Sequence, residues 1–160
     1  MLRRADHDLA AEAMRALDRI REVFPTGVVP PEVLTRVMGL PPMLRVSGVL
    51  PVLAFYAAKG KGNRKVDQAY GIVGSQLRAQ IIGVLGWAEQ GTPSLDLDFL
   101  KRLTEHLRRD PATTARITVR LEQFSAWLRR LAEALEKEQD LAKAARKADA
   151  GGEYDGNADV

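Results

Sequence analysis

Apolar residues recur at helical spacing along almost the whole chain of 160 residues. Residues three or four positions apart lie on one face of an α-helix, whereas a half-buried strand requires alternation of apolar and polar residues. No stretch shows that alternation. One sustained helical series advances by steps of four, three, four, three and four through Ile117, Leu121, Phe124, Leu128, Leu131 and Leu135. The spacing predicts an all-α fold, a compact bundle of about six helices with a long C-terminal helix.

Prolines and glycines set the expected ends of the helices in the first part of the chain. The first helix ends at residues 25–27, and its buried face consists of Leu9, Ala13, Leu17, Ile20 and Phe24. A short helix follows from Pro31 to Gly39. A third, near residues 42–58, is apolar almost all round and is expected to be the buried central helix. We expect it to bend at Pro51, which lacks an N–H, and to be crossed closely by another helix at Gly48.

Three further helices are expected in the second part of the chain. One covers residues 66–90, and we attribute its four internal glycines to close helix contacts: Gly71, Gly74, Gly83 and Gly86. A short amphipathic helix follows, with Asp96 and Asp98 at its N-terminus, where acidic side chains interact favourably with the helix dipole. Asp110 and Pro111 then suit the start of the long helix. Its apolar series spans fewer than four clean heptads, which favours packing in a bundle over a coiled coil.

The domain organisation predicted from this pattern is simple. Residues 1–138 are expected to form one helical domain, and residues 139–160 a helix extension and a disordered acidic tail. The last thirteen residues, ADAGGEYDGNADV, contain four acids, three glycines and no base. Such a composition is typical of disordered segments, because it cannot bury enough apolar surface to fold.

Cysteine content and apolar run length bear on the location of the protein. The chain has no cysteine, which excludes disulfides and thiolate metal sites and suits a reducing cytoplasm. Its longest uncharged apolar stretch, VSGVLPVLAFYAA, is too short to span a bilayer. The N-terminus, MLRRADHDLA, lacks the apolar segment of a secretory signal. We therefore expect a cytoplasmic protein with no membrane partner.

Positive charge is concentrated in the middle third of the chain. The formal net charge is only +3, yet residues 33–88 carry seven basic residues and one acid, Asp67. Residues 1–32 and 89–160 have net charges of −1 and −2. Such a block attracts polyanions, above all a nucleic-acid backbone. The alternative is that these cations only solvate a helix face.

The densest part of the block is the sequence KGKGNRK, residues 59–65. It does not match a nucleotide-binding P-loop, which follows a strand and ends in Lys-Ser or Lys-Thr. Point-charge contact with phosphates fits better, aided by the unshielded amides of Gly60 and Gly62. The predicted phosphate-binding residues are Arg45, Lys59, Lys61, Arg64 and Lys65, with Arg78 one helix further on.

No catalytic constellation stands out in the sequence. His7 and His106 lie far apart, neither has a second ligand at the spacing of a helical metal site, and both are interpreted as surface residues. No Gly-x-Ser-x-Gly motif occurs, and without cysteine there is no thiol nucleophile. The sequence thus predicts neither an enzyme nor a cofactor. Of the nearby aromatic residues, Phe55 and Tyr70 are assigned to the core, and Tyr56 is the one candidate for stacking on a base.

Two stretches resemble a known family. LPPMLRVSGVLPVLAFYAAKG, residues 40–60, is similar to the signature of the small subunits of type III-B CRISPR effectors, the Cmr complexes. The matching positions are Pro41 or Pro42, then Ser47, Gly48 and Val49, then Leu53, Ala54 and Phe55, and last Ala58, Lys59 and Gly60. Ser47 and Val49 replace the family's Asn and Leu. Pro51 is an unusual residue within this stretch, and a tyrosine that often precedes the signature is missing. The stretch from Trp127 to Ala132 resembles the family's Trp-Leu-Lys-Arg-Phe-Ala, so the likeness spans residues 5–138.

The resemblance implies a non-catalytic helical subunit of an antiviral ribonucleoprotein. Such subunits stack with further copies as a minor filament beside the backbone subunits that hold the guide RNA. They help to form the groove in which target RNA pairs with the guide. The implied partners are therefore the backbone and large subunits, further copies of this chain, the guide RNA and the target RNA. Cleavage of the target would belong to other subunits.

Two alternatives stay open. The first is a helical protein–protein adaptor without a nucleic-acid role, in which the long helix docks a partner and the basic block meets an acidic protein surface. The second is a helix-turn-helix DNA-binding protein. It is disfavoured, because no segment combines a short turn with a polar, base-reading second helix.

Overall fold

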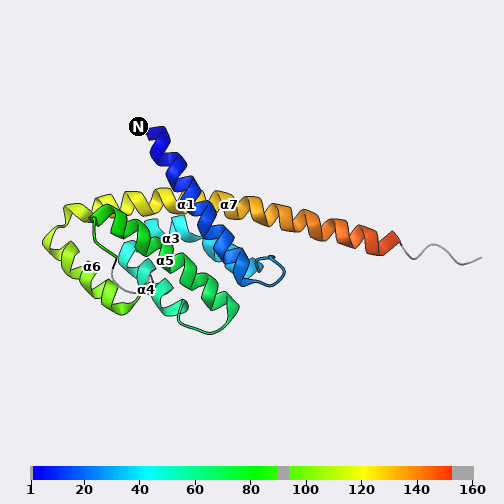
Figure 1. Cartoon of the computed structure of the whole chain (residues 1–160), viewed down its shortest axis with the longest axis horizontal. Coiled ribbons are helices and arrows are strands. Elements are labelled where there is room, and N and C mark those ends of the chain that lie inside the picture. The colour runs from blue at the N-terminus through cyan, green and yellow to red at the C-terminus, as the bar shows by residue number, and fades with distance from the viewer. Residues whose placement is uncertain (1, 90–93, 153–160) are drawn as a thin grey trace, which may run out of the picture.

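Seven α-helices make up the described part of the chain, which comprises residues 2–89 and 94–152 of the computed structural model (Figure 1). In order they are α1 (Leu2–Val23), α2 (Pro31–Met38), α3 (Leu40–Ser47), α4 (Val49–Lys59), α5 (Lys65–Leu85), α6 (Leu97–Arg109) and α7 (Ala112–Gly151). These residues contain no strand. The all-α prediction and the long C-terminal helix are confirmed. No helix within the described ranges is both long and apolar enough to cross a bilayer.

The long helix α7 is the element against which most of the bundle packs. It contacts α1, α2, α3 and α5, while its last turns project from the body of the molecule (Figure 1). The predicted series buries Ile117, Leu121, Phe124, Leu128 and Leu135 against those helices. Contacts with these helices, and with α6, confirm packing in a bundle. Pro111 has helical backbone angles, and the Thr113 hydroxyl donates to Asp110 Oδ2 at 2.6 Å, so the helix starts where expected.

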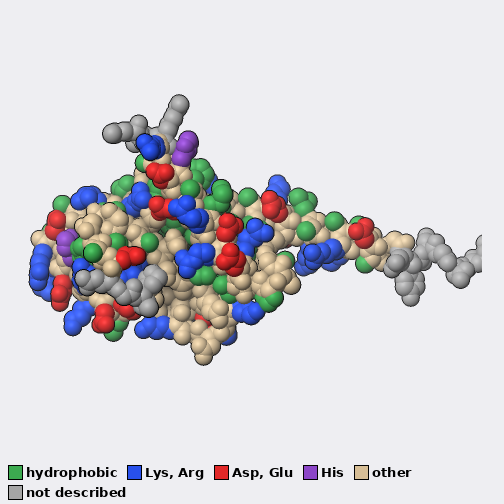
Figure 2. All heavy atoms as spheres, viewed as in Figure 1, with side chains coloured by type: hydrophobic (Ala, Val, Ile, Leu, Met, Phe, Trp, Pro, Cys, Tyr) green, Lys and Arg blue, Asp and Glu red, His purple; other side chains and the backbone are tan. Residues whose placement is uncertain are grey.

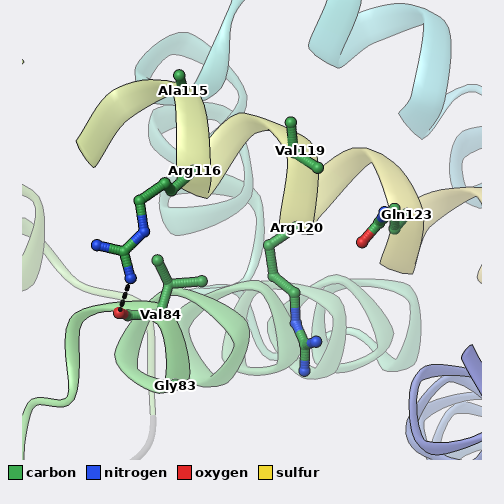
Figure 3. Close-up of a pocket in the computed structure, with 7 residues that line it drawn as sticks. All are labelled: Gly83, Val84, Ala115, Arg116, Val119, Arg120 and Gln123. Atoms are coloured by element: carbon green, nitrogen blue, oxygen red, sulfur yellow. Dashed lines mark hydrogen bonds between the residues drawn. The ribbon is translucent and has the colours of Figure 1, made fainter. Parts of the chain in front are cut away.

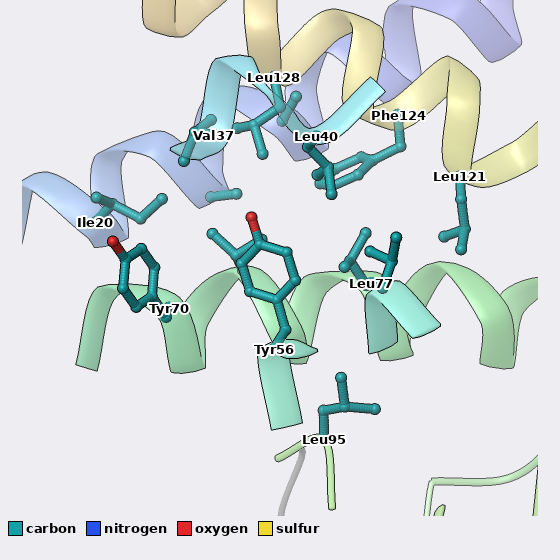
Figure 4. Close-up of a cluster of buried hydrophobic side chains, with 14 of the residues drawn as sticks. Ile20, Val37, Leu40, Tyr56, Tyr70, Leu77, Leu95, Leu121, Phe124 and Leu128 are labelled. Atoms are coloured by element: carbon teal, nitrogen blue, oxygen red, sulfur yellow. The ribbon is translucent and has the colours of Figure 1, made fainter. Parts of the chain in front are cut away.

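Side chains from all seven described helices meet in a single core, part of which is drawn in Figure 4. The predicted face of α1 is buried throughout: Leu9, Ala13, Leu17, Ile20 and Phe24. From α4, Tyr56 enters the same core and is 1% exposed. Each fully buried large side chain contributes about 1.5–3 kcal/mol by leaving water, so this cluster is the main source of stability.

The expected central helix is two helices, and the break lies at Gly48. Gly48 has φ +84° and ψ 174°, a conformation that L-residues rarely adopt, and its N–H donates to the Leu44 carbonyl. The predicted bend at Pro51 is wrong, because Pro51 is the third residue of α4 and first-turn N–H groups have no partner in the helix. The predicted close crossing at Gly48 is also wrong, since a Cβ there would meet no atom within 4 Å.

Helix α5 ends earlier than predicted. Gly86 adopts the left-handed conformation with φ +66°, and the N–H groups of Gly86 and Trp87 both donate to the Ile82 carbonyl. This glycine cap stops the helix at Leu85, whereas we expected it to reach residue 90, which with 91–93 lies outside the described residues. Gly86 is therefore a cap and not an internal packing position.

Helix α7 continues beyond the core. The side-chain amide of Gln139 accepts from Val29 N at 2.9 Å and donates to Val29 O at 3.0 Å, which fixes the α1–α2 connection. From Asp140 onward every described residue is exposed, yet the helix reaches Gly151. The prediction of disorder is wrong for residues 148–151, and the rest of the acidic tail, residues 153–160, lies outside the described residues. The domain boundary at residue 138 stays a prediction.

Candidate nucleic-acid interface

The basic turn, residues 59–65, joins α4 to α5 at the lower edge of the view in Figure 1. Its first glycine lies where the two helices touch. A Cβ on Gly60 would come within 2.8 Å of the Gly71 Cα, so the two backbones approach more closely than any side chain allows. The expected helix contact at Gly71 is thus confirmed, and its partner is the end of α4.

The two glycines of the turn have structural roles of their own. The Gly60 N–H donates to the Tyr56 carbonyl at 2.9 Å, so the expectation that this amide is free is wrong. A Cβ on Gly62 would lie 2.1 Å from Asp67 Oδ2. Packing of the turn therefore explains why both positions are glycine, and the Gly60 N–H is not available to phosphate.

Arg64 is the one cation of the turn that is held by an acid. Its backbone N–H donates to Asp67 Oδ2 at 3.2 Å, its Nε to Oδ2 at 3.0 Å and its Nη2 to Oδ1 at 2.8 Å. These hydrogen bonds keep the pKa of Asp67 below its usual range and raise the pKa of Arg64. The Asp67 side chain is 8% exposed and the Arg64 side chain 70%, so much of the guanidinium faces solvent with its charge offset. The spacing of three residues at a helix start signals this pairing.

Three lysines of the turn carry the uncompensated charge. Lys59, Lys61 and Lys65 are exposed, and within residues 2–89 and 94–152 none of them forms an ion pair. The structure thus brings together four of the six residues predicted to bind phosphate, and three of the four are available. The charge is local, because basic and acidic side chains are interspersed over the face seen in Figure 2.

The other two predicted residues lie elsewhere. Arg45 is exposed at the end of α3, beside the start of α4, and is separated from the basic turn by the eleven residues of α4. That length corresponds to about 16 Å along the helix axis. Arg78 is 8% exposed, and its guanidinium carbon lies 5.1 Å from the centre of the Phe99 ring. Because it is buried against α6, Arg78 does not belong to an exposed phosphate-binding surface.

Tyr56 is buried and Phe55 is partly exposed, the reverse of what we expected for these two residues. Tyr56 is buried and packs edge-on against Phe55 and Tyr70, with centroids 5.3 and 6.3 Å away, so the prediction that it stacks on a base is wrong. Desolvation by burial raises the pKa of its hydroxyl. Phe55, which we assigned to the core, is only half-buried, and two cations lie over its ring: Arg36 at 4.9 Å and Lys59 at 6.0 Å.

A groove lies between α5 and α7 (Figure 3). It is lined by Gly83, Val84, Ala115, Arg116, Val119, Arg120 and Gln123. Arg116 Nη2 donates to the Val84 carbonyl at 3.2 Å and Arg120 Nε donates to Gln80 Oε1 at 2.7 Å. Both arginines therefore hold α7 to α5. The residues that line this groove include no His, Asp, Glu, Lys, Tyr or Cys, the usual general acids and bases.

The histidines lie apart from any metal-binding group. His7 is exposed on α1, and His106 is half-buried on α6 with its ring edge-on to Trp87 at 5.5 Å. Among the described residues, no three His, Asp or Glu side chains lie close enough together to hold a metal ion.

Comparison with known proteins gives one match. The model of a family described as CRISPR-associated protein (Cas_Cmr5) matches residues 9–135. That range contains the basic turn and ends at Leu135, the last buried residue of α7. No curated protein and no solved structure matches the chain.

Proposed function

Because the chain belongs to the CRISPR-associated Cmr5 family, and is thereby a subunit of the Cmr complex, we propose that it is a non-catalytic structural component of a type III-B effector ribonucleoprotein. The family match over residues 9–135 is the observation that carries this proposal. In the assembly, copies of the chain stack as a minor filament beside the backbone and large subunits. The site of action is the cytoplasm, in keeping with a chain that has no cysteine.

The RNA-binding role rests on the basic turn. Lys59, Lys61 and Lys65 contact phosphates of the target RNA or of its duplex with the guide, and their exposure and lack of ion pairs among the described residues support this role. Arg64 contributes less, because Asp67 offsets its charge. Arg45 forms a separate contact at the other end of α4. Binding of this kind is insensitive to sequence and weakens as salt is raised.

Reconstituted effector complexes test this role. Complexes carry the unchanged subunit, the triple variant K59A/K61A/K65A or no subunit, and their affinity for target RNA is measured over a range of salt concentrations. The triple variant is expected to bind less tightly and to lower the slope of log affinity against log salt by about 2, since each lost contact with single-stranded nucleic acid removes about 0.7.

The chain offers a matched control. Lys137, Lys143 and Lys147 are also exposed but lie on α7, Lys143 and Lys147 on its projecting part and Lys137 just before it. The triple variant K137A/K143A/K147A removes the same charge and is expected to leave the slope unchanged. An unchanged slope in the turn variant would contradict the assignment, and equal losses in both variants would indicate general charge attraction in place of a site.

A protein–protein adaptor is the second candidate, and the projecting end of α7 favours it. From Asp140 onward this helix is exposed on all sides, with Leu141 65% exposed, and short isolated helices are marginally stable in water. An adaptor predicts that omitting the subunit disrupts assembly of the complex, while complexes that do assemble keep full affinity for RNA and the full salt slope.

A further inference from the structure

An arginine side chain lies over an aromatic ring beside the basic turn. Arg36 projects from α2 and Phe55 from α4, and the guanidinium carbon lies 4.9 Å from the ring centre. Arg36 is exposed and Phe55 is half-buried. We call this pair the Arg36–Phe55 platform. A guanidinium held over an aromatic ring presents its plane in a fixed orientation.

The surroundings of the platform are strongly positive. Lys59 Nζ lies 6.0 Å from the same ring, and Lys61 and Lys65 follow in the basic turn. Glu32, an exposed acid on the same helix as Arg36, acts on Arg64, while the charge of Asp67 is offset by Arg64. The exposed cations Arg36, Lys59, Lys61 and Lys65 outnumber this acid, and a polyanion is the complementary partner.

The other arginine–aromatic pairs of the described residues have different settings. Arg78 and Phe99 are buried. Trp127, below Arg130, donates its indole N–H to Asp6 at 2.7 Å. Arg102 stacks on Trp87 at 3.9 Å, on a helix where Asp98 and Glu105 are interspersed with Lys101, Arg108 and Arg109. The Arg36–Phe55 platform differs in lying beside the three lysines of the basic turn, none of which forms an ion pair within the described ranges.

We propose that the Arg36–Phe55 platform stacks an unpaired base of the RNA, and this inference rests on the RNA-binding role proposed above. The base lies on the guanidinium plane of Arg36, Phe55 positions that plane from below, and Lys59 contacts the flanking phosphate. Bases stack on arginine planes and aromatic rings irrespective of sequence, because every base has a π-face. The lysines hold the backbone, and the platform orients one nucleotide relative to it.

The test uses assembled effector complexes with the variants Arg36→Lys and Phe55→Leu. Arg36→Lys keeps the positive charge but removes the planar guanidinium group. This variant stays informative if Phe55→Leu weakens folding. Each variant is expected to reduce affinity for target RNA about 5-fold or more, the range for loss of one stacked base, while the salt slope stays unchanged. Arg102→Lys is the matched control, because it breaks a similar pair elsewhere, and it is expected to change neither quantity.

Target RNAs with one abasic nucleotide, placed at each position in turn, identify the base. At one position the abasic RNA is expected to bind the unchanged complex less tightly and to be insensitive to Arg36→Lys. If K59A/K61A/K65A lowers the salt slope while Arg36→Lys has no effect, the platform is not a base site and the RNA-binding role stands. If neither K59A/K61A/K65A nor Arg36→Lys changes RNA affinity or the salt slope, both proposals fail. If Arg36→Lys reduces incorporation of the subunit in place of RNA affinity, the platform is a protein interface.

Discussion

Asp67 connects the basic turn to the first turn of α5 through three hydrogen bonds from Arg64. The largest cause of the lowered pKa of Asp67 is the side-chain hydrogen bond from Arg64, which favours the ionised carboxylate. A carboxyl whose pKa is lower in the folded chain stabilises the fold above its unfolded pKa. That contribution is lost as the pH falls through the lowered, folded value.

Asp67→Asn is therefore expected to destabilise the protein at neutral pH by an amount that shrinks on acidification. Denaturant unfolding of the isolated chain at several values between about pH 2 and pH 7 measures the difference from the unchanged protein. Asp140→Asn is the control, because Asp140 is exposed on the projecting part of α7. A difference for Asp67→Asn that stays constant over this range would contradict the pairing.

The sequence predicted the lysines of the site but not the platform beside them. Lys59, Lys61 and Lys65 are neighbours in the chain, so their clustering needs no tertiary information. Arg36 meets Phe55 only because the fold brings its long side chain on α2 over a ring on α4. The exchange of Phe55 and Tyr56 has a local cause: a helix that is apolar almost all round has no polar face to show which side is buried.

At the scale of elements, close contact between α4 and α5 sets the geometry of the basic turn. Gly60 and Gly71 meet backbone to backbone. Gly60→Ala is expected to force the helices apart and to lower the free energy of unfolding by about 1–3 kcal/mol, as overpacking does. Gly83→Ala is the matched control, because a Cβ there would meet no atom within 4 Å.

In the control, alanine is the better helix former and is expected to stabilise α5 by up to about 1 kcal/mol. Urea denaturation of both variants gives the comparison. Equal and small effects at the two positions would mean that α4 and α5 do not approach at Gly60. The effect of Gly60→Ala on the turn also predicts weaker RNA binding in the assembled complex.

The helices themselves were largely predictable, and the exceptions share a cause. Periodicity identified the buried faces of α1 and α7, because burial repeats with the helix turn. The break at Gly48 and the early end at Gly86 both depend on a glycine with positive φ. A sequence does not distinguish such a glycine from one required by packing, as at Gly60 and Gly71. The predicted bend at Pro51 failed for a similar reason. The free-energy cost of a proline depends on its position in the helix, and the sequence did not show that α4 begins two residues earlier.

At the scale of the whole molecule, the chain divides into a packed body and a projecting helix. The body contains the basic turn and the platform, and the family match ends with its last buried residue, Leu135. The projecting part of α7 is exposed throughout. A body with an exposed basic edge and a projecting helix suits a subunit that contacts RNA and neighbouring subunits at different surfaces.

The most direct test of the central claim is crosslinking of target RNA to this subunit within the assembled complex. RNA that contains a photoactivatable uridine is bound, irradiated and digested, and the crosslinked peptides are identified by mass spectrometry. If RNA contacts the basic turn and the Arg36–Phe55 platform, we expect crosslinks in peptides that contain residues 59–65 and in those that contain Arg36 or Phe55. Crosslinks confined to other surfaces of this subunit, or to other subunits alone, would contradict it.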